Sequence, residues 1–108
     1  IGASSPKNLT ITIIDNEHFG ETGMQPAHTG LGTDIAKVAQ GTGFKKSQTI
    51  YSSEELICFG KKIKNFEGPN LAVIKVSTDY VPLVLPPRDG AYLKDRFRLS
   101  LLGKKATI

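Results

Sequence analysis

The 108-residue sequence contains one cysteine, one methionine and no tryptophan. A single cysteine, Cys58, excludes an internal disulfide framework, and we expect a reducing, cytoplasmic setting. No apolar run approaches the ~20 residues that cross a bilayer, and no signal-peptide pattern opens the chain, so we expect no membrane partner. Hydrophobic residues make up 39% of the chain and charged residues 22%. This composition is typical of a single globular domain and excludes wholesale disorder.

The net charge of +4 comes from the C-terminal part of the chain. Residues 1–85 carry eight lysines and eight acidic residues, whereas residues 86–108 carry six basic residues and two acidic ones. A basic tail can bind nucleic acid or an acidic surface. Leu, Phe and Tyr residues interrupt the positive charges, so they form no dense cluster. We therefore expect no nucleic-acid partner, and a tail that is solvated or packs on a partner.

Three short apolar runs predict β-strands at residues 9–14, 47–51 and 71–76. The first run is continuously β-branched, which is typical of a parallel strand covered on both faces. One helical pattern lies between the first and second strands and another between the second and third, and this alternation indicates a parallel sheet with right-handed crossovers. The predicted fold class is α/β: a partial parallel sheet with flanking helices over residues 1–80.

Two helices are expected between these strands. Thr33 or Asp34 caps the first helix. Ser52, followed three residues later by Glu55, forms a capping-box pattern that opens the second. We expect Cys58 to be a packing residue of that second helix. The buried stripe of the second helix is predicted to consist of Leu56, Phe59, Ile63 and Phe66.

Prolines mark the C-terminal part of the chain. Pro82, Pro86 and Pro87 lack the donor that a central strand needs, so we expect an extended surface segment there. A short terminal helix is expected over residues 93–102. Residues 81–108 together form a Pro-containing basic C-terminal tail.

The first predicted strand ends at Asp15 and Asn16 and opens into a long polar loop, residues 16–32. Structureless loops of this length are uncommon and usually functional, and ligands of open α/β sheets bind beyond the carboxyl ends of strands. The Asn16 amide oxygen and a nearby backbone carbonyl suit Mg²⁺, while Gly20 and Gly23 let backbone N–H groups turn toward a phosphate. The residues predict either a diphosphate held through Mg²⁺ or a simple turn, since Asp and Asn favour turns.

The segment IIDNEHFGETGMQ resembles the second half of the thiamine-diphosphate-binding motif. In that motif a GDG triplet precedes, by about 25–30 residues, an apolar strand ending in Asn-Asn or Asp-Asn. The pattern of DN, a short loop and TGxQP is similar to the phosphonopyruvate and sulfopyruvate decarboxylase branch of the 2-oxo acid decarboxylases. The resemblance covers residues 1–78 and is tightest over residues 9–26. It implies a lyase that uses thiamine diphosphate and Mg²⁺ to decarboxylate a 2-oxo acid, or a related carboligase.

The resemblance also implies roles for individual residues. Asn16 would give its side-chain oxygen to Mg²⁺, and the main-chain carbonyl of His18 would be a second ligand. Backbone groups of Phe19, Gly20 and Glu21 would lie along the diphosphate.

Other residues near this segment carry weaker predictions. Asp15 takes the place of the motif's first Asn and is expected to be structural. The catalytic residue is unknown: His18, His28 and Glu21 are candidate proton-transfer groups, and each is also an ordinary exposed loop residue.

Two parts of the family's site are absent from the sequence. These are the GDG triplet, which supplies a carboxylate for Mg²⁺, and the glutamate that activates the aminopyrimidine. We therefore expect a fragment, inactive alone, that depends on missing domains or partner subunits of one enzyme and forms a homo-oligomer; the lack of an initial Met agrees with this. The alternative is a non-catalytic α/β binding module whose basic tail docks on an acidic partner.

Overall fold

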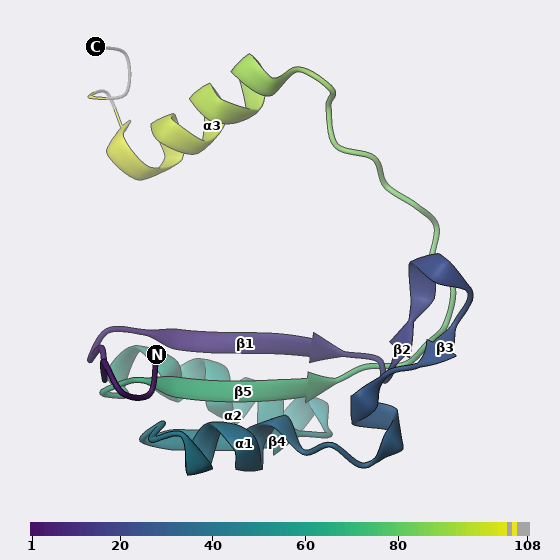
Figure 1. The fold of residues 1–108 in the computed structure, drawn as a ribbon. Coiled ribbons are helices and arrows are strands. Elements are labelled where there is room, and N and C mark those ends of the chain that lie inside the picture. The colour runs from purple at the N-terminus through teal and green to yellow at the C-terminus, as the bar shows by residue number, and fades with distance from the viewer. Residues whose placement is uncertain (104, 106–108) are drawn as a thin grey trace.

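The computed structural model describes residues 1–103 and 105, and its centre is a three-stranded parallel sheet (Figure 1). The strand order is β1 (Thr10–Asp15), β5 (Asn70–Lys75) and β4 (Lys46–Ile50). β5 pairs in parallel with both neighbours. The predicted α/β fold with a parallel sheet is confirmed, and each strand lies within one residue of its predicted position.

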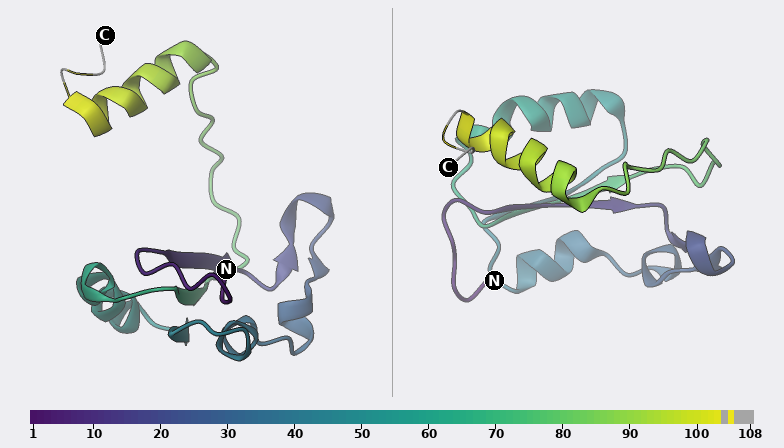
Figure 2. Two further views of the ribbon diagram at one scale, coloured as in Figure 1. Left: turned by 60° about the vertical axis from the view of Figure 1, so that its left-hand side comes forward. Right: turned by 90° about the horizontal axis from the view of Figure 1, so that it is seen from above.

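A helix covers each side of the sheet, so β5 is buried on both faces (Figure 2). α1 (Ile35–Gly41) packs on one side and α2 (Ser53–Lys62) on the other. The α1 side is built from Ala36, Ala39, Leu71 and Val73, with Ile11, Ile13, Ile35 and Phe44 partly buried around them. The α2 side is built from Ile50, Phe59 and Ala72, with Ile63, Phe66 and Ile74 partly buried around them.

β1 differs from its prediction, because only one of its faces is covered. Ile11 and Ile13 pack on the α1 side. Ile14 is 65% exposed, and Thr12 is exposed as well. Successive strand residues point to opposite faces, and α2 lies over β4 and β5 rather than over β1. The expectation of a strand covered on both faces was therefore wrong for β1, although it holds for β5.

Both helices between the strands begin at predicted caps. The Asp34 carboxylate accepts a hydrogen bond from the Lys37 N–H (3.0 Å), so Asp34 rather than Thr33 caps α1. The Ser52 hydroxyl accepts from the Glu55 N–H (3.2 Å), which confirms the first half of the capping box. In return, the Glu55 carboxylate accepts from the Tyr51 N–H (2.8 Å) instead of the cap residue's own N–H.

The predicted buried stripe of α2 is only partly correct. Phe59 is buried, and Phe66 lies beside it with ring centroids 6.3 Å apart. Leu56 is 39% exposed and Cys58 is exposed, so the predictions that they pack in the core were wrong. The sheet contributes Ile50, Ala72 and Ile74 to the apolar cluster on this side, and these residues pack with Phe59, Ile63 and Phe66 rather than with Leu56 or Cys58. A short 3-10 helix, η3 (Ile63–Asn65), ends the segment.

The segment after β1 is folded, which corrects the expectation of a structureless loop. It contains a two-stranded antiparallel hairpin of β2 (His18–Phe19) and β3 (Gln25–Pro26). A 3-10 turn, η1 (Gly20–Thr22), closes the hairpin, and a second, η2 (His28–Leu31), follows it. The hairpin holds the predicted ligand residues at the carboxyl edge of the sheet.

The C-terminal part of the chain lies apart from the sheet (Figures 1 and 2). An extended segment follows β5 and leads to α3 (Gly90–Leu102), none of whose residues is buried. The helix starts earlier than predicted because the Asp89 carboxylate accepts from the Tyr92 N–H (3.0 Å) and caps it. Part of the predicted basic tail, residues 104 and 106–108, falls outside the described residues. No helix in the described part of the chain is long and apolar enough to span a membrane.

Ile50 tests the core on the α2 side. Ile50 is 2% exposed, whereas Ile57 on α2 is 58% exposed. We expect Ile50→Ala to lower the free energy of unfolding by about 2–5 kcal/mol, because it leaves a cavity against Phe59. Ile57→Ala should change it by less than about 0.5 kcal/mol. Urea unfolding of both variants measures the difference, and equal losses would contradict the packing of α2 on β4 and β5.

Candidate functional site

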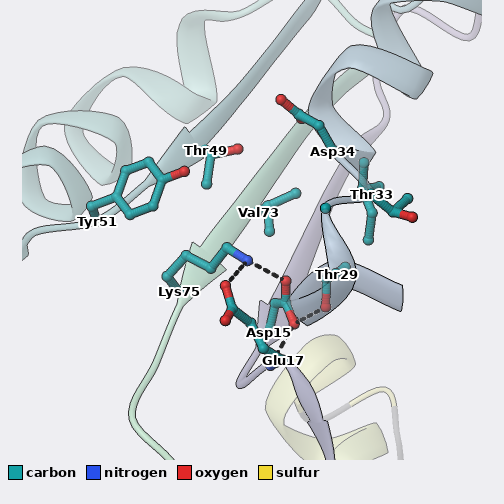
Figure 3. Close-up of a pocket in the computed structure, with 11 residues that line it drawn as sticks. Asp15, Glu17, Thr29, Thr33, Asp34, Thr49, Tyr51, Val73 and Lys75 are labelled. Atoms are coloured by element: carbon teal, nitrogen blue, oxygen red, sulfur yellow. Dashed lines mark hydrogen bonds and ion pairs between the residues drawn. The ribbon is translucent and has the colours of Figure 1, made fainter. Parts of the chain in front are cut away.

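The carboxyl ends of all three parallel strands meet at one edge of the sheet, which is where ligands of such sheets bind. A cavity of about 200 Å³ lies there, on the α1 side (Figure 3). Polar side chains from β1, β5, η2 and the end of β4 line it, among them Asp15, Thr29, Tyr51 and Lys75. A second cavity, of about 380 Å³, is lined by Asn16 and His18 and shares Tyr51 and Lys75 with the first. The second cavity therefore contains two of the predicted ligand residues, whereas the first is lined by their neighbours Asp15 and Glu17.

Asp15 ends β1 and is held from three directions (Figure 3). One carboxylate oxygen, Oδ2, lies 2.9 Å from the Lys75 ammonium at the end of β5. The other, Oδ1, accepts hydrogen bonds from the Glu17 N–H and the Thr29 hydroxyl, both at 2.8 Å. Asp15 is only 8% exposed. These three contacts tie Asp15 to β5, to η2 and to the turn after β1, which agrees with the structural role expected for Asp15.

The ionisation of this cluster follows from the same contacts. Burial tends to raise the pKa of Asp15, but hydrogen bonds from Lys75, Thr29 and the Glu17 N–H together outweigh it and hold that pKa below its ordinary value. The pairs with Glu17 and Asp15 raise the pKa of Lys75. Both partners of the ion pair are therefore charged at neutral pH.

Asn16 forms a tight turn immediately after β1. Its side-chain oxygen accepts a hydrogen bond from the His18 N–H (3.1 Å), and the His18 Nδ1 lies 2.9 Å from the Asn16 carbonyl oxygen. A Cβ added at Gly20 would lie 3.9 Å from the Asn16 amide nitrogen, so Gly20 is also close. The structure thus brings together three of the predicted cofactor residues, Asn16, His18 and Gly20.

The other predicted residues lie further along the hairpin. Phe19 on β2 is 53% exposed, and Glu21 in η1 is exposed. Both line a shallow hollow of about 330 Å³ that His18 and Gly20 share. His28 is exposed at the start of η2, separate from this hollow. Of the three proton-transfer candidates, His18 is the one packed against Asn16.

The residues present fit a Mg²⁺ ion shared with a diphosphate, although they supply only part of its coordination. An amide oxygen has two lone pairs, and the Asn16 oxygen uses one of them for the His18 N–H. Mg²⁺ takes few protein oxygens and completes its shell with phosphate and water. Among the described residues, no three His, Cys, Asp or Glu side chains form a metal-binding group. Further ligands would have to come from other parts of the protein.

Lys75, Glu17 and Thr29 were not predicted as site residues. Lys75 ends an apolar strand, and β5 pairs with β1 in a register that sets it beside Asp15. The sequence feature that could have predicted this pair is a lysine at the end of one strand and an aspartate at the end of another. The sequence alone does not reveal that these two strands are neighbours.

Asp15→Asn tests the charge cluster. The pKa of Asp15 is lowered from its ordinary value of 3.8. The ionised carboxylate therefore stabilises the folded state fully above pH 3.8, and this stabilisation is lost as the pH falls through the lowered pKa. We expect Asp15→Asn to cost about 1–3 kcal/mol of unfolding free energy at pH 7. The difference from wild type should shrink steadily below pH ~4. Urea unfolding across this range measures it, and a loss that does not vary with pH would contradict the assignment.

Comparison with known proteins supports a relationship to one enzyme. The chain is 43% identical to sulfopyruvate decarboxylase subunit beta of Methanocaldococcus jannaschii over 65 residues, which are 60% of the chain's length. The match covers 32% of that protein, so the chain spans about a third of this curated relative. No protein-family profile matches the chain, and no solved structure matches it. The chain is thus related, over more than half of its length, to a decarboxylase subunit.

Proposed function

We propose that the chain is part of a thiamine-diphosphate- and Mg²⁺-dependent 2-oxo acid decarboxylase similar to sulfopyruvate or phosphonopyruvate decarboxylase. The observation that carries this proposal is the Asn16 turn at the carboxyl end of β1, in a cavity that His18 also lines. The 43% identity to a sulfopyruvate decarboxylase subunit supports it. The resemblance of the DN segment to the cofactor motif supplies the cofactor's identity.

In this proposal the chain holds the diphosphate end of the cofactor. Asn16 gives its side-chain oxygen to Mg²⁺, and the His18 main-chain carbonyl gives a second oxygen. Backbone groups of Phe19, Gly20 and Glu21 lie along the diphosphate, in the hollow that these residues line. When bound, the thiazolium ring supplies the electron sink for decarboxylation. His18 is the best-placed candidate for proton transfer, because it is half-buried and adjoins Asn16.

The proposal requires two groups that this chain does not contain. One is the GDG carboxylate, which completes the Mg²⁺ site, and the other is the glutamate that activates the cofactor. The name of the related protein designates it as a subunit, which supports a partner subunit for this chain too. We propose that the working enzyme is a cytoplasmic oligomer and that the 108-residue chain alone is inactive.

Asn16→Ala tests the ligand assignment. In the parent protein we expect it to weaken Mg²⁺-dependent binding of thiamine diphosphate by at least about 100-fold, since the loss of a direct ligand exceeds that of a supporting residue. Asn8→Ala, in an exposed turn before β1, is the matched control and should bind as wild type does. Isothermal titration with thiamine diphosphate and Mg²⁺ measures both. Wild-type affinity in Asn16→Ala would refute the assignment.

The parent gene offers a second test. The resemblance predicts a GDG triplet within about 30 residues upstream of Asn16. Because the chain holds only 15 residues before Asn16, the triplet should be encoded shortly before Ile1. Sequencing the gene upstream decides this, and an upstream region without the triplet would remove the basis for the cofactor proposal.

A further inference from the structure

Asn16 lies between two acidic residues, and the side chains of both reach the same lysine (Figure 3). The Lys75 ammonium lies 2.9 Å from Asp15 Oδ2 and 2.6 Å from Glu17 Oε1. Lys75 belongs to β5, sixty residues away in the sequence, and the parallel register sets it opposite Asp15. The lysine therefore joins the residues before and after Asn16 to the centre of the sheet.

The turn that carries Asn16 needs such support. Glu17 adopts φ +63, a left-handed conformation that costs energy in a residue with a side chain. Its carbonyl accepts a hydrogen bond from the Ala27 N–H (2.8 Å), and a Cβ at Gly30 would come within 2.9 Å of that oxygen. The turn is thus held by Ala27, at the start of η2, on one side and by Lys75 on the other.

Burial makes the Lys75–Asp15 contact stronger than the surface ion pairs of this protein. The side chains of Lys75 and Asp15 are 20% and 8% exposed. The Lys37–Asp34 pair is 81% and 39% exposed by the same measure. Pairs of the exposed kind contribute little to stability. Without Lys75, two carboxylates that lack a cationic partner would also lie beside the place proposed for an anionic diphosphate.

We propose that Lys75 is a positioning residue: by bridging Asp15 and Glu17 it fixes the turn that aims the Asn16 side-chain oxygen at the proposed Mg²⁺ site. The effect of Lys75 on the binding of thiamine diphosphate and Mg²⁺ rests on the proposed function, whereas its effect on the turn does not. Lys75 acts through the two carboxylates rather than by touching the ion, since both of them engage its ammonium group.

The first experiment needs no cofactor. Amide hydrogen exchange of the full chain is compared for wild type, Lys75→Met, Lys75→Arg and Lys61→Met, the last an exposed control on α2. We expect the Glu17 and His18 N–H groups to exchange about tenfold faster or more in Lys75→Met, because these are the groups that bond to Asp15 and Asn16. The Val73 N–H, in the middle of β5, should be unchanged. Lys75→Arg should keep most of the protection.

The second experiment measures the consequence for binding. Lys75→Met should weaken Mg²⁺-dependent binding of thiamine diphosphate to the parent protein by about 10–100-fold, the usual effect of losing a residue that orients a ligand. Lys75→Arg should recover most of the affinity, and Lys61→Met should match wild type. Wild-type exchange at Glu17 and His18 in Lys75→Met would overturn the proposal.

Glu17→Gln keeps the inference testable if Lys75→Met unfolds the chain. It removes one of the two ion pairs at a side chain that is 44% exposed, and intermediate exchange at His18 is expected. Unchanged exchange in this variant, with binding also unchanged, would overturn the role of the bridge. If wild type binds no thiamine diphosphate, the proposed function fails, while the exchange result still decides whether Lys75 holds the turn.

Discussion

The ion pair between Asp15 and Lys75 joins the ends of two parallel strands that are sixty residues apart in the sequence. Parallel neighbours cannot be linked by a short turn, so this side-chain contact reinforces, at the carboxyl ends, the backbone pairing that holds β1 beside β5. Asp15 also accepts from Thr29, which connects η2 to the same point. The candidate site is built around this contact: the Asn16 turn, the hairpin and the two cavities all adjoin it.

Burial of its charge explains why the Asp15 carboxylate has several hydrogen-bond partners. A carboxylate that is 8% exposed costs free energy unless hydrogen bonds compensate for it. Lys75, the Thr29 hydroxyl and the Glu17 N–H provide that compensation. Removing one partner of such a group is costly, because the other charge stays behind. The same contacts that stabilise Asp15 also hold the neighbouring Asn16 turn in one conformation.

The rest of the described chain leaves apolar surface uncovered. Ile14 on β1 is 65% exposed, and α3 exposes Phe97 and Leu101 at 65% and 67%. The described residues likewise contain no group of three His, Cys, Asp or Glu side chains that could hold a metal ion by itself. These observations agree with the proposal that other domains or subunits complete the enzyme.

The sequence by itself determined the three parallel strands and the two helices between them, but not the hairpin after β1. Apolar runs set the strands to within one residue, and Asp34 and Ser52 mark the helix starts because their short side chains satisfy free N–H groups. The DN segment marked the candidate site. Only the tertiary structure decided that β5 is the central strand, that Cys58 and Leu56 are exposed, and that Lys75 lies beside Asp15. Local patterns reflect backbone preference and periodicity, whereas strand order and register arise from pairing between distant segments, which no short stretch of sequence records.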